Sequence, residues 1–504
     1  MKNNQTTNPF WGAGENKDFG KVAIEYAAGQ DVILDKLFVQ NECYVDKAHV
    51  LMLYKQKLIS KDVDKDLLIC VEEIQKLDKK GKFELKKELE DVHSNIEQHI
   101  IKKIGIEKGG YLRLAIARND QIYTDTLMYL KNHLLIICTN LIEIVNKLLS
   151  IAGKNINTIM PGYTHLRISQ PITVGHWLMA KVYHLLDDLD HILYAVHSID
   201  KCPLGIVEMA GTSLNLDREY LSKLLGFNKP TENSLYTSNQ RGENEVKILA
   251  VLSLLAMHIR RTMQELIIYS GTEFGLVEIN DLYVTGGTAQ PNLRNPDTLE
   301  VVRANCPKVY SKLIETLMIM DIQTSGYNRD TQQTKPSLME GLKIIEDTVP
   351  VFGGILTSLK FNKTKMLEIA SLNFGIAPDV AFKLCIKGNV SFRESYKVVK
   401  SLIKDGYLKK SFSELTPKLI KMVSKKILNK EINIDEKDLT EFKTIQNSVF
   451  SHTCYGGPAP SQVKNMIKNV TSKIKKYSKG IFNYQNKIKQ ALTNLDNEVK
   501  KLIA

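Results

Sequence analysis

The sequence predicts a mainly α-helical protein whose centre is a bundle of long helices. Apolar residues recur at helical spacing through most of the chain, and few segments alternate as strands do. At 504 residues the chain is too long for one ordinary core. We therefore expect a three-part chain, with an N-terminal helical domain at 1–112, a central long-helix bundle domain at 113–365 and a C-terminal helical domain at 366–504.

The central part contains the strongest helical signals. The run from about 120 to 150 is long for a globular helix and ends at Gly153. Runs of similar length lie at about 170–200, 239–270 and 299–325. Helices of this length imply a long bundle. Apolar residues on more than one face of these helices indicate that several chains share the bundle core.

The composition excludes several classes of protein. The formal charge of +12 comes from lysines spread along helix faces, without the clustering and interleaved aromatic residues of nucleic-acid interfaces, so we expect no nucleic-acid partner. A positive average field favours capture of a small anionic substrate. Apolar runs such as 248–259 are shorter than the about 20 residues that span a membrane, so we expect no membrane partner.

The N-terminal segment and the cysteines indicate the compartment. No apolar signal segment is visible in the first residues, and the seven cysteines are scattered without a CxxC pair. This pattern is typical of reduced thiols. We therefore expect a cytoplasmic protein with no metal site.

Five polar stretches have more loop-forming character than packing requires. They are "EDVHSNIE" at 90–97, "ARNDQIYTD" at 117–125, "TIMPGYTHLRISQP" at 158–171, "TGGTAQPNLRNPD" at 285–297 and "SGYNRDTQQTKP" at 325–336. Taken alone, His165 is more often a structural histidine, and Asn119 is more often the cap of the helix that follows it. The order of the five stretches is the specific signal.

That order resembles argininosuccinate lyase, within the fumarase/aspartase superfamily. "MPGYTHLRISQPITVGHWLMA" is similar to the second signature of the family, and "PLGIVEMAGTSLNLDRE", "GYNRDTQQTK" and "SHTCYGGPAPSQVK" correspond to further family segments. The resemblance covers essentially the whole chain. It implies a homotetramer built around a bundle of helices from four subunits, with each active site assembled from three chains. It also implies a β-elimination, without a cofactor, that splits a C–N bond and releases fumarate.

This reaction explains why polar loops must meet. A proton leaves the carbon next to a carboxylate, and the resulting dianion forms only among fixed donors and cations. A base and an acid must therefore flank the substrate. By resemblance the catalytic candidates are His165, Thr164 and Thr288. The residues expected to bind substrate are Asp91, His93, Arg118, Asn119, Asn295, Tyr327, Gln332 and Lys335.

The chain departs from the family pattern at the catalytic loop. The family loop reads Gly-Ser-Ser-x-Met-Pro-x-Lys-x-Asn-Pro-Asp, and here it reads "GGTAQPNLRNPD". Gly287 replaces the Ser that abstracts the proton, Thr288 replaces the second Ser and Leu293 replaces the Lys. Ile116 and Ala117 replace an Arg and a Ser of the first signature, and a substrate-contacting Ser near the N-terminus corresponds to Gly29. Thr288 is a candidate replacement base, Arg294 is a candidate replacement for the charge of the lost Lys, and Arg113 replaces a His near the same site.

Three functions stay open at this stage. The first is cleavage of argininosuccinate, or of a close N-substituted succinate, to an amine and fumarate. The second is an elimination or addition on a different substrate, because Ile116, Ala117 and Leu293 leave a less charged pocket. The third is a weakly active or inactive homotetramer with a metabolite-binding or structural role. The sequence also leaves open whether the pathway is arginine biosynthesis or specialised metabolism.

Overall fold

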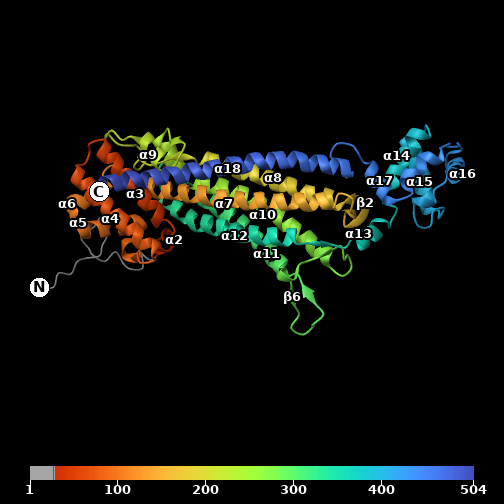
Figure 1. The fold of residues 1–504 in the computed structure, drawn as a ribbon, viewed down its shortest axis with the longest axis horizontal. Helices are drawn as coiled ribbons and strands as arrows, with labels where there is room; N and C mark the ends of the chain where they lie inside the picture. Colours follow the sequence, from red (N-terminus) through yellow and green to blue (C-terminus); the bar gives the residue numbers. More distant parts are fainter. Residues whose placement is uncertain (1–25, 28) are drawn as a thin grey trace.

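The computed structural model describes residues 26–27 and 29–504, and it is mainly α-helical (Figure 1). The prediction about a secretory signal concerns residues outside this range. Long helices run side by side along the longest axis, with short N-terminal helices at one end and short C-terminal helices at the other (Figure 1). The mainly α fold class with a long central bundle is confirmed.

Six helices form the bundle, and they pack because each buries an apolar face. In the first of them Leu141, Val145 and Leu148 are fully buried. Hydrophobic burial of this kind is the dominant source of stability in the fold. The six helices are α7 (Arg118–Lys154), α8 (Val174–Ser198), α10 (Ser234–Ser270), α11 (Asp297–Met320), α12 (Thr334–Thr357) and α18 (Pro460–Ile503).

Helix α10 is kinked near its start, where Arg241 and Gly242 leave helical geometry. Gly242 has φ +90°, a conformation that L side chains rarely adopt. A Cβ at Gly242 would also overlap the side chain of Met320 on α11. The Glu245 carboxylate accepts a hydrogen bond from the Gly242 N–H at 2.7 Å and closes the kink. The kink places Arg241 next to the cavity described below.

The N-terminal helices share one apolar core with the bundle, since buried residues such as Val39, Leu68 and Ile96 belong to the same cluster as those of α7. Helix α5 begins at an Asp91 cap, and α4 begins at a Ser60 cap. The N-terminal elements are α2 (Asp31–Asp35), α3 (Val39–Lys55), α4 (Lys61–Lys79), η1 (Lys87–Leu89), α5 (Val92–Ile104), α6 (Ile106–Gly109) and η2 (Gly110–Arg113).

The C-terminal helices have a separate apolar core that contains Val380, Leu384 and Val423. Helix α13 (Lys363–Ala370), whose buried Met366 and Ile369 belong to the bundle core, does not share it, and neither does α18. The buried residues of α18, such as Val470 and Ile474, belong to the bundle core, because α18 runs back along the bundle (Figure 1). The three-domain division stays a prediction, and its boundary at 366 does not describe the place of α18. The C-terminal elements are α13 (Lys363–Ala370), α14 (Ala377–Lys387), α15 (Phe392–Lys404), η5 (Phe412–Glu414), α16 (Pro417–Leu428), η6 (Glu436–Phe442) and α17 (Ile445–Ser451).

The described strands form four two-stranded pairs. Two antiparallel hairpins matter for function, β1 (Ile159–Thr164) with β2 (Arg167–Thr173), and β6 (Thr285–Gly286) with β7 (Arg294–Asn295). The hairpin of β6 and β7 projects from the side of the bundle (Figure 1). The other elements are β3 (Lys201–Cys202), α9 (Arg218–Leu224), β4 (Lys229–Pro230), β5 (Val277–Glu278), η3 (Asp281–Tyr283), η4 (Arg329–Gln333) and β8 (Lys360–Phe361).

Among the described helices, α7 has the length and composition of a membrane span, with a mean hydropathy of 1.8 over its most apolar window. The sequence pattern did not indicate this, because polar residues such as Lys131 interrupt the apolar runs. In the structure 56% of that window is buried inside the chain, and Lys131 is paired with Asp200 at 3.0 Å. Packing within the bundle therefore accounts for much of the apolar character of α7.

Candidate active site

A polar cavity of about 90 Å³ lies where the N-terminal helices meet the starts of α7 and α12. This is several times the roughly 10–15 Å³ that one water molecule needs. Seven of the predicted site residues line it, namely Asp91, His93, Arg118, Asn119, Tyr327, Gln332 and Lys335. The other lining residues are Asp31, Asp35, Ile122, Arg241 and Arg329.

Lys335, in the first turn of α12, forms a buried ion triad with two carboxylates of α2. Its Nζ lies 2.8 Å from Asp31 Oδ1 and 2.7 Å from Asp35 Oδ1. Burial favours the neutral amine, but Asp35 and Asp31 outweigh it and raise the pKa of Lys335. Gln332 donates a hydrogen bond to Asp31 Oδ2 at 3.1 Å. A lysine ammonium has three donors, so one donor remains for a ligand.

Asp91 connects α5 to α7. Its Oδ1 accepts hydrogen bonds from the Ser94 N–H at 2.8 Å and from the Ser94 hydroxyl at 2.6 Å, and its Oδ2 lies 2.8 Å from Arg118 Nη1. Burial acts to raise the pKa of Asp91, but His93, Arg118 and the bonds from Ser94 lower it to about 2. Asp91 is therefore an anion that holds Arg118 at the cavity wall.

Asn119 is not the cap of α7, so that interpretation of the sequence is wrong. The cap position is Ala117, and the Asp120 carboxylate accepts from the Ala117 N–H at 3.0 Å. Asp120 also accepts from the N–H groups of Gly205 and Val207 at 2.9 and 3.0 Å. Since Asp120 serves the helix terminus, the Asn119 side chain is left at the cavity.

His93 lies between the cavity and a buried acidic cluster. Its Nδ1 is 2.8 Å from Glu42 Oε1, and its side chain is 2% exposed. Burial, followed by the neighbouring Glu42, raises the pKa values of Asp46 and Asp125 well above the ordinary range. Glu42, His93 and Asp125 bring ligand atoms within 4.8 Å of one another, a grouping that could hold a metal ion. His93 therefore links the cavity wall to this acidic cluster through Glu42.

The sequence-based prediction missed four polar residues of the cavity wall, namely Asp31, Asp35, Arg241 and Arg329. Two signals were available. Asp31 and Asp35 stand one helical turn apart in "DVILD", which places both on one face. Gly242 interrupts a long helical pattern directly after Arg241, and such a glycine often marks a functional break.

Thr164 is the last residue of β1 and His165 begins the turn between β1 and β2, at the opposite end of α7 from the cavity. At about 1.5 Å per residue, the 37 residues of α7 span roughly 55 Å. His165 and Leu166 have positive φ values of 53° and 56°, which is strained backbone for residues other than glycine. His165 lines a separate groove of about 1180 Å³ between α10, α11 and this hairpin, together with Arg260 and Arg303.

Thr288 and Asn295 lie on the third segment, the hairpin of β6 and β7. Thr288 is exposed near the tip, and Asn295 is half-buried in β7 opposite Thr285. Within the described chain, no contact joins this hairpin to the polar cavity, since the residues that line the cavity come from other elements. The predicted site residues thus occupy three separate places in one chain.

Arg294 and Arg113 both have partners within the chain. Arg294 lies 3.3 Å from Glu278 Oε1, donates to the Ile279 carbonyl at 2.9 Å and pairs with Asp281. Arg113 donates to Glu97 Oε2 at 3.1 Å and to Gln121. The partners of Arg294 are exposed surface carboxylates, and Nη2 of Arg113 has no hydrogen-bond partner among the described residues.

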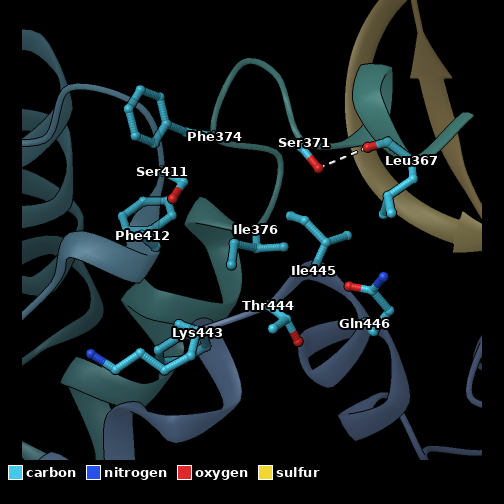
Figure 2. A pocket seen from close by; sticks show the side chains of 11 residues that line it. Leu367, Ser371, Phe374, Ile376, Ser411, Phe412, Lys443, Thr444, Ile445 and Gln446 are labelled. Carbon is cyan, nitrogen blue, oxygen red and sulfur yellow. Dashed lines mark hydrogen bonds between the residues drawn. The ribbon is translucent and has the colours of Figure 1, made fainter. Parts of the chain in front are cut away.

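A further cavity, of about 220 Å³, lies among the C-terminal helices (Figure 2). Its wall combines apolar residues such as Phe374, Ile376 and Phe412 with polar residues such as Ser411 and Gln446. The Ser371 hydroxyl donates to the Leu367 carbonyl at 2.7 Å. The Lys443 ammonium pairs with Glu436 at 3.1 Å. No residue of the predicted site lines this cavity.

Comparison with known proteins identifies the family. The protein family described as "Lyase" has a sequence model that matches residues 31–311 of this chain. The argininosuccinate lyase of Pelagibacter ubique is 34% identical over 476 residues, which covers 93% of this chain and 99% of that protein. The argininosuccinate lyase of Carboxydothermus hydrogenoformans is 33% identical over 459 residues, with 91% and 98% covered.

Solved structures share the fold. A structure of an EDDS lyase variant with bound fumarate superposes with a TM-score of 0.83 at 21% identity, covering 94% of this chain and 95% of that chain. A class II fumarase from Schistosoma mansoni superposes with a TM-score of 0.69 at 17% identity, with 84% and 93% covered. Together with the family match and the polar cavity, these relatives show that the chain belongs to the argininosuccinate lyase family of the fumarase/aspartase superfamily and is a carbon–nitrogen lyase of that type.

Proposed function

We propose that the protein cleaves argininosuccinate to arginine and fumarate by β-elimination, or a close N-substituted succinate to the corresponding amine and fumarate. The observation that carries the proposal is the polar cavity itself. Seven residues predicted from the family resemblance line one cavity, although they come from three sequence stretches that span more than 200 positions. A packing role for each residue separately does not explain that convergence.

We further propose that the active form is a homotetramer with shared active sites. Thr164 and His165 stand roughly 55 Å from the cavity, given the 37 residues of α7. No side-chain rearrangement brings them to Lys335 in one chain. Antiparallel association of bundles would bring the β1–β2 end of one chain to the cavity of another, which suits the closed symmetry of homo-oligomers. A location in the cytoplasm stays a prediction.

In the proposed reaction a base removes a proton from the succinyl carbon next to a carboxylate. The electron pair forms the C=C bond of fumarate, the C–N bond breaks, and the leaving nitrogen takes a proton from an acid. Thr288 is the proposed base, and His165 is its proposed acid–base partner. Thr164 and Asn295 are the proposed hydrogen-bond donors to the developing dianion. Asn119, Tyr327, Gln332 and Lys335 are the proposed groups that hold the amino-acid half. Fixed donors of this kind usually contribute more than any other effect to such catalysis.

The test is fumarate release from argininosuccinate by the purified protein, followed by ultraviolet absorbance. His165→Ala is expected to lower kcat by roughly 100- to 10,000-fold, the usual contribution of a positioned acid or base. Wild-type protein that releases no fumarate while remaining folded and tetrameric would refute the proposal.

A second candidate function is a weakly active or inactive homotetramer that binds a metabolite or has a structural role. The observation that favours it is the loop at 285–297, where Gly287 and Leu293 offer no polar side-chain atom and Arg294 is held by Glu278 and Asp281. Tight binding of argininosuccinate without turnover, unaffected by Thr288→Ala, would support this second function over the first.

A further inference from the structure

Arg241 is a buried cation of the cavity wall that forms no ion pair with a carboxylate of the described residues. Only 8% of its surface is exposed. Within the described part of the chain its close side-chain contact is with the ring of Tyr327, whose centroid lies 5.1 Å from Cζ. A buried guanidinium without an anion is costly, because its five donors and its charge are removed from water.

Each of the cations Arg118, Arg329 and Lys335 on the same wall has a protein carboxylate within 4 Å. Arg118 lies 2.8 Å from Asp91 and 3.0 Å from Glu90, Arg329 lies 3.7 Å from Glu90, and Lys335 lies 2.7 Å from Asp35. The cavity thus has one cationic position, Arg241, that the described residues leave for a ligand anion.

The backbone holds Arg241 at this position. The kink at Arg241 and Gly242 redirects α10, and the Glu245 carboxylate is committed to the Gly242 N–H at 2.7 Å. Burial raises the pKa of Glu245, which weakens it further as a counter-ion for Arg241. A guanidinium with a fixed backbone and a planar set of donors binds carboxylates with two parallel hydrogen bonds.

We propose that Arg241 binds a carboxylate of the substrate and thereby sets the specificity of this lyase for acids over their neutral counterparts. The Tyr327 ring, whose centroid lies 5.1 Å from Arg241 Cζ, forms a cation–π contact with the guanidinium at the cavity wall. This role of Arg241 adds a specificity-determining residue to the proposed function, and it rests on that function for the identity of the substrate. The charge of the wall alone indicates a small anion, and the proposed function identifies that anion as a carboxylate.

The test compares acids with amides of the same shape in calorimetric titrations of the full-length protein. L-arginine is compared with L-argininamide, succinate with succinamide, and fumarate with fumaramide. In the wild type at least one acid is expected to bind roughly 10- to 100-fold more tightly than its amide, the usual effect of hydrogen bonds to a charged group. In Arg241→Gln that preference is expected to vanish.

Arg393→Gln, an exposed arginine of α15, serves as the matched control and is expected to keep the wild-type preference. If Arg241→Gln does not fold, Arg241→Lys replaces it, since it keeps the charge but loses the paired hydrogen bonds and should weaken the preference. A preference that survives both substitutions, or a wild type that binds no acid better than its amide, overturns the inference. Failure of the proposed function would be distinguishable from failure of this inference. In that case the protein would release no fumarate but would still bind acids more tightly than their amides.

Discussion

Asn119 and His165 lie at opposite ends of helix α7, which has 37 residues and therefore spans roughly 55 Å. Asn119 lines the polar cavity next to the N-terminal helices, and His165 lies in the hairpin beyond the other end of α7. Two side chains expected to contact one small substrate are thus held apart by a rigid rod within each chain.

This separation predicts complementation between inactive variants. Asn119→Ala and His165→Ala are each expected to be inactive alone. If each site combines the two ends from different chains, a 1:1 mixture that is unfolded and reassembled should recover about a quarter of the wild-type activity, because that fraction of sites has both residues intact. The measurement is fumarate release after refolding, with each variant refolded alone as control. A mixture no more active than its components would show that each site lies within one chain.

Thr288 is the expected base, and its hydroxyl should be indispensable. Thr288→Ala is predicted to lower kcat roughly 100- to 10,000-fold with a small change in KM, since a base acts in the transition state. Thr288→Ser, which keeps the hydroxyl, should retain most of the activity. Equal activity of Thr288→Ala and the wild type would remove Thr288 from the mechanism.

The buried triad of Lys335 with Asp31 and Asp35 should be a large stability determinant. Lys335→Met leaves two buried carboxylates without their cation and is expected to lower the free energy of unfolding by about 3–5 kcal/mol. The control on the same helix is Lys343→Met, because Lys343 is exposed and paired with Asp347 at 2.5 Å. That exposed pair should contribute almost nothing. Urea unfolding of both variants checks the contrast, and equal losses would contradict it.

His49 should make stability depend on pH. Burial lowers the pKa of His49 to about 4, although its Nε2 lies 2.9 Å from the Leu114 carbonyl oxygen. Because the folded pKa lies below the unfolded value of about 6.5, the unfolded state binds more protons between these values, and stability is lost as pH falls from about 6.5 to about 4. The slope attributable to His49 is at most about 1.4 kcal/mol per pH unit.

The measurement is urea unfolding of the wild type and His49→Gln across that pH range. The stability difference between them should shrink as pH falls, because only the wild type has a histidine to protonate at this position. His191→Gln, at an exposed histidine of α8, should run parallel to the wild type. A difference between wild type and His49→Gln that is constant with pH would show that His49 does not titrate in this window.

Gly242→Ala should destabilise the protein, because φ is +90° and a Cβ would overlap Met320. The expected cost is at least about 1–2 kcal/mol from the backbone alone. Gly480→Ala on α18 is the opposite case, since a Cβ there meets nothing within 4 Å and the backbone is helical. It is expected to stabilise by about 0.5–1 kcal/mol. Thermal unfolding of both variants gives the comparison, and two changes of the same sign would contradict it.

The sequence was sufficient for the fold class and for most of the cavity. Helical periodicity marked the bundle, and the order of the polar stretches marked Asn119, Tyr327, Gln332 and Lys335. The sequence was insufficient where tertiary contacts determine the partner or the burial of a side chain. The pairing of Lys335 with Asp31 depends on how α2 packs against α12, and the burial of Arg241 depends on a kink that local patterns signal only through Gly242. The cap of α7 was misassigned because Asp120 competes with Asn119 for the same helix terminus.

Helix α18 has a consequence for how the protein is made. The ammonium of Lys47 is fully buried, and one of its partners is Asp496 Oδ1 at 2.8 Å, near the end of α18. At 5–20 residues per second the ribosome needs roughly 20–80 s to proceed from Lys47 to the start of α18. Throughout that interval the apolar surface that α18 will cover is exposed on the nascent chain. Lys47 also lacks the Asp496 carboxylate during this time. A chain that ends before Leu495 lacks both this buried leucine and the Asp496 carboxylate, and it therefore leaves Lys47 without one of its counter-ions.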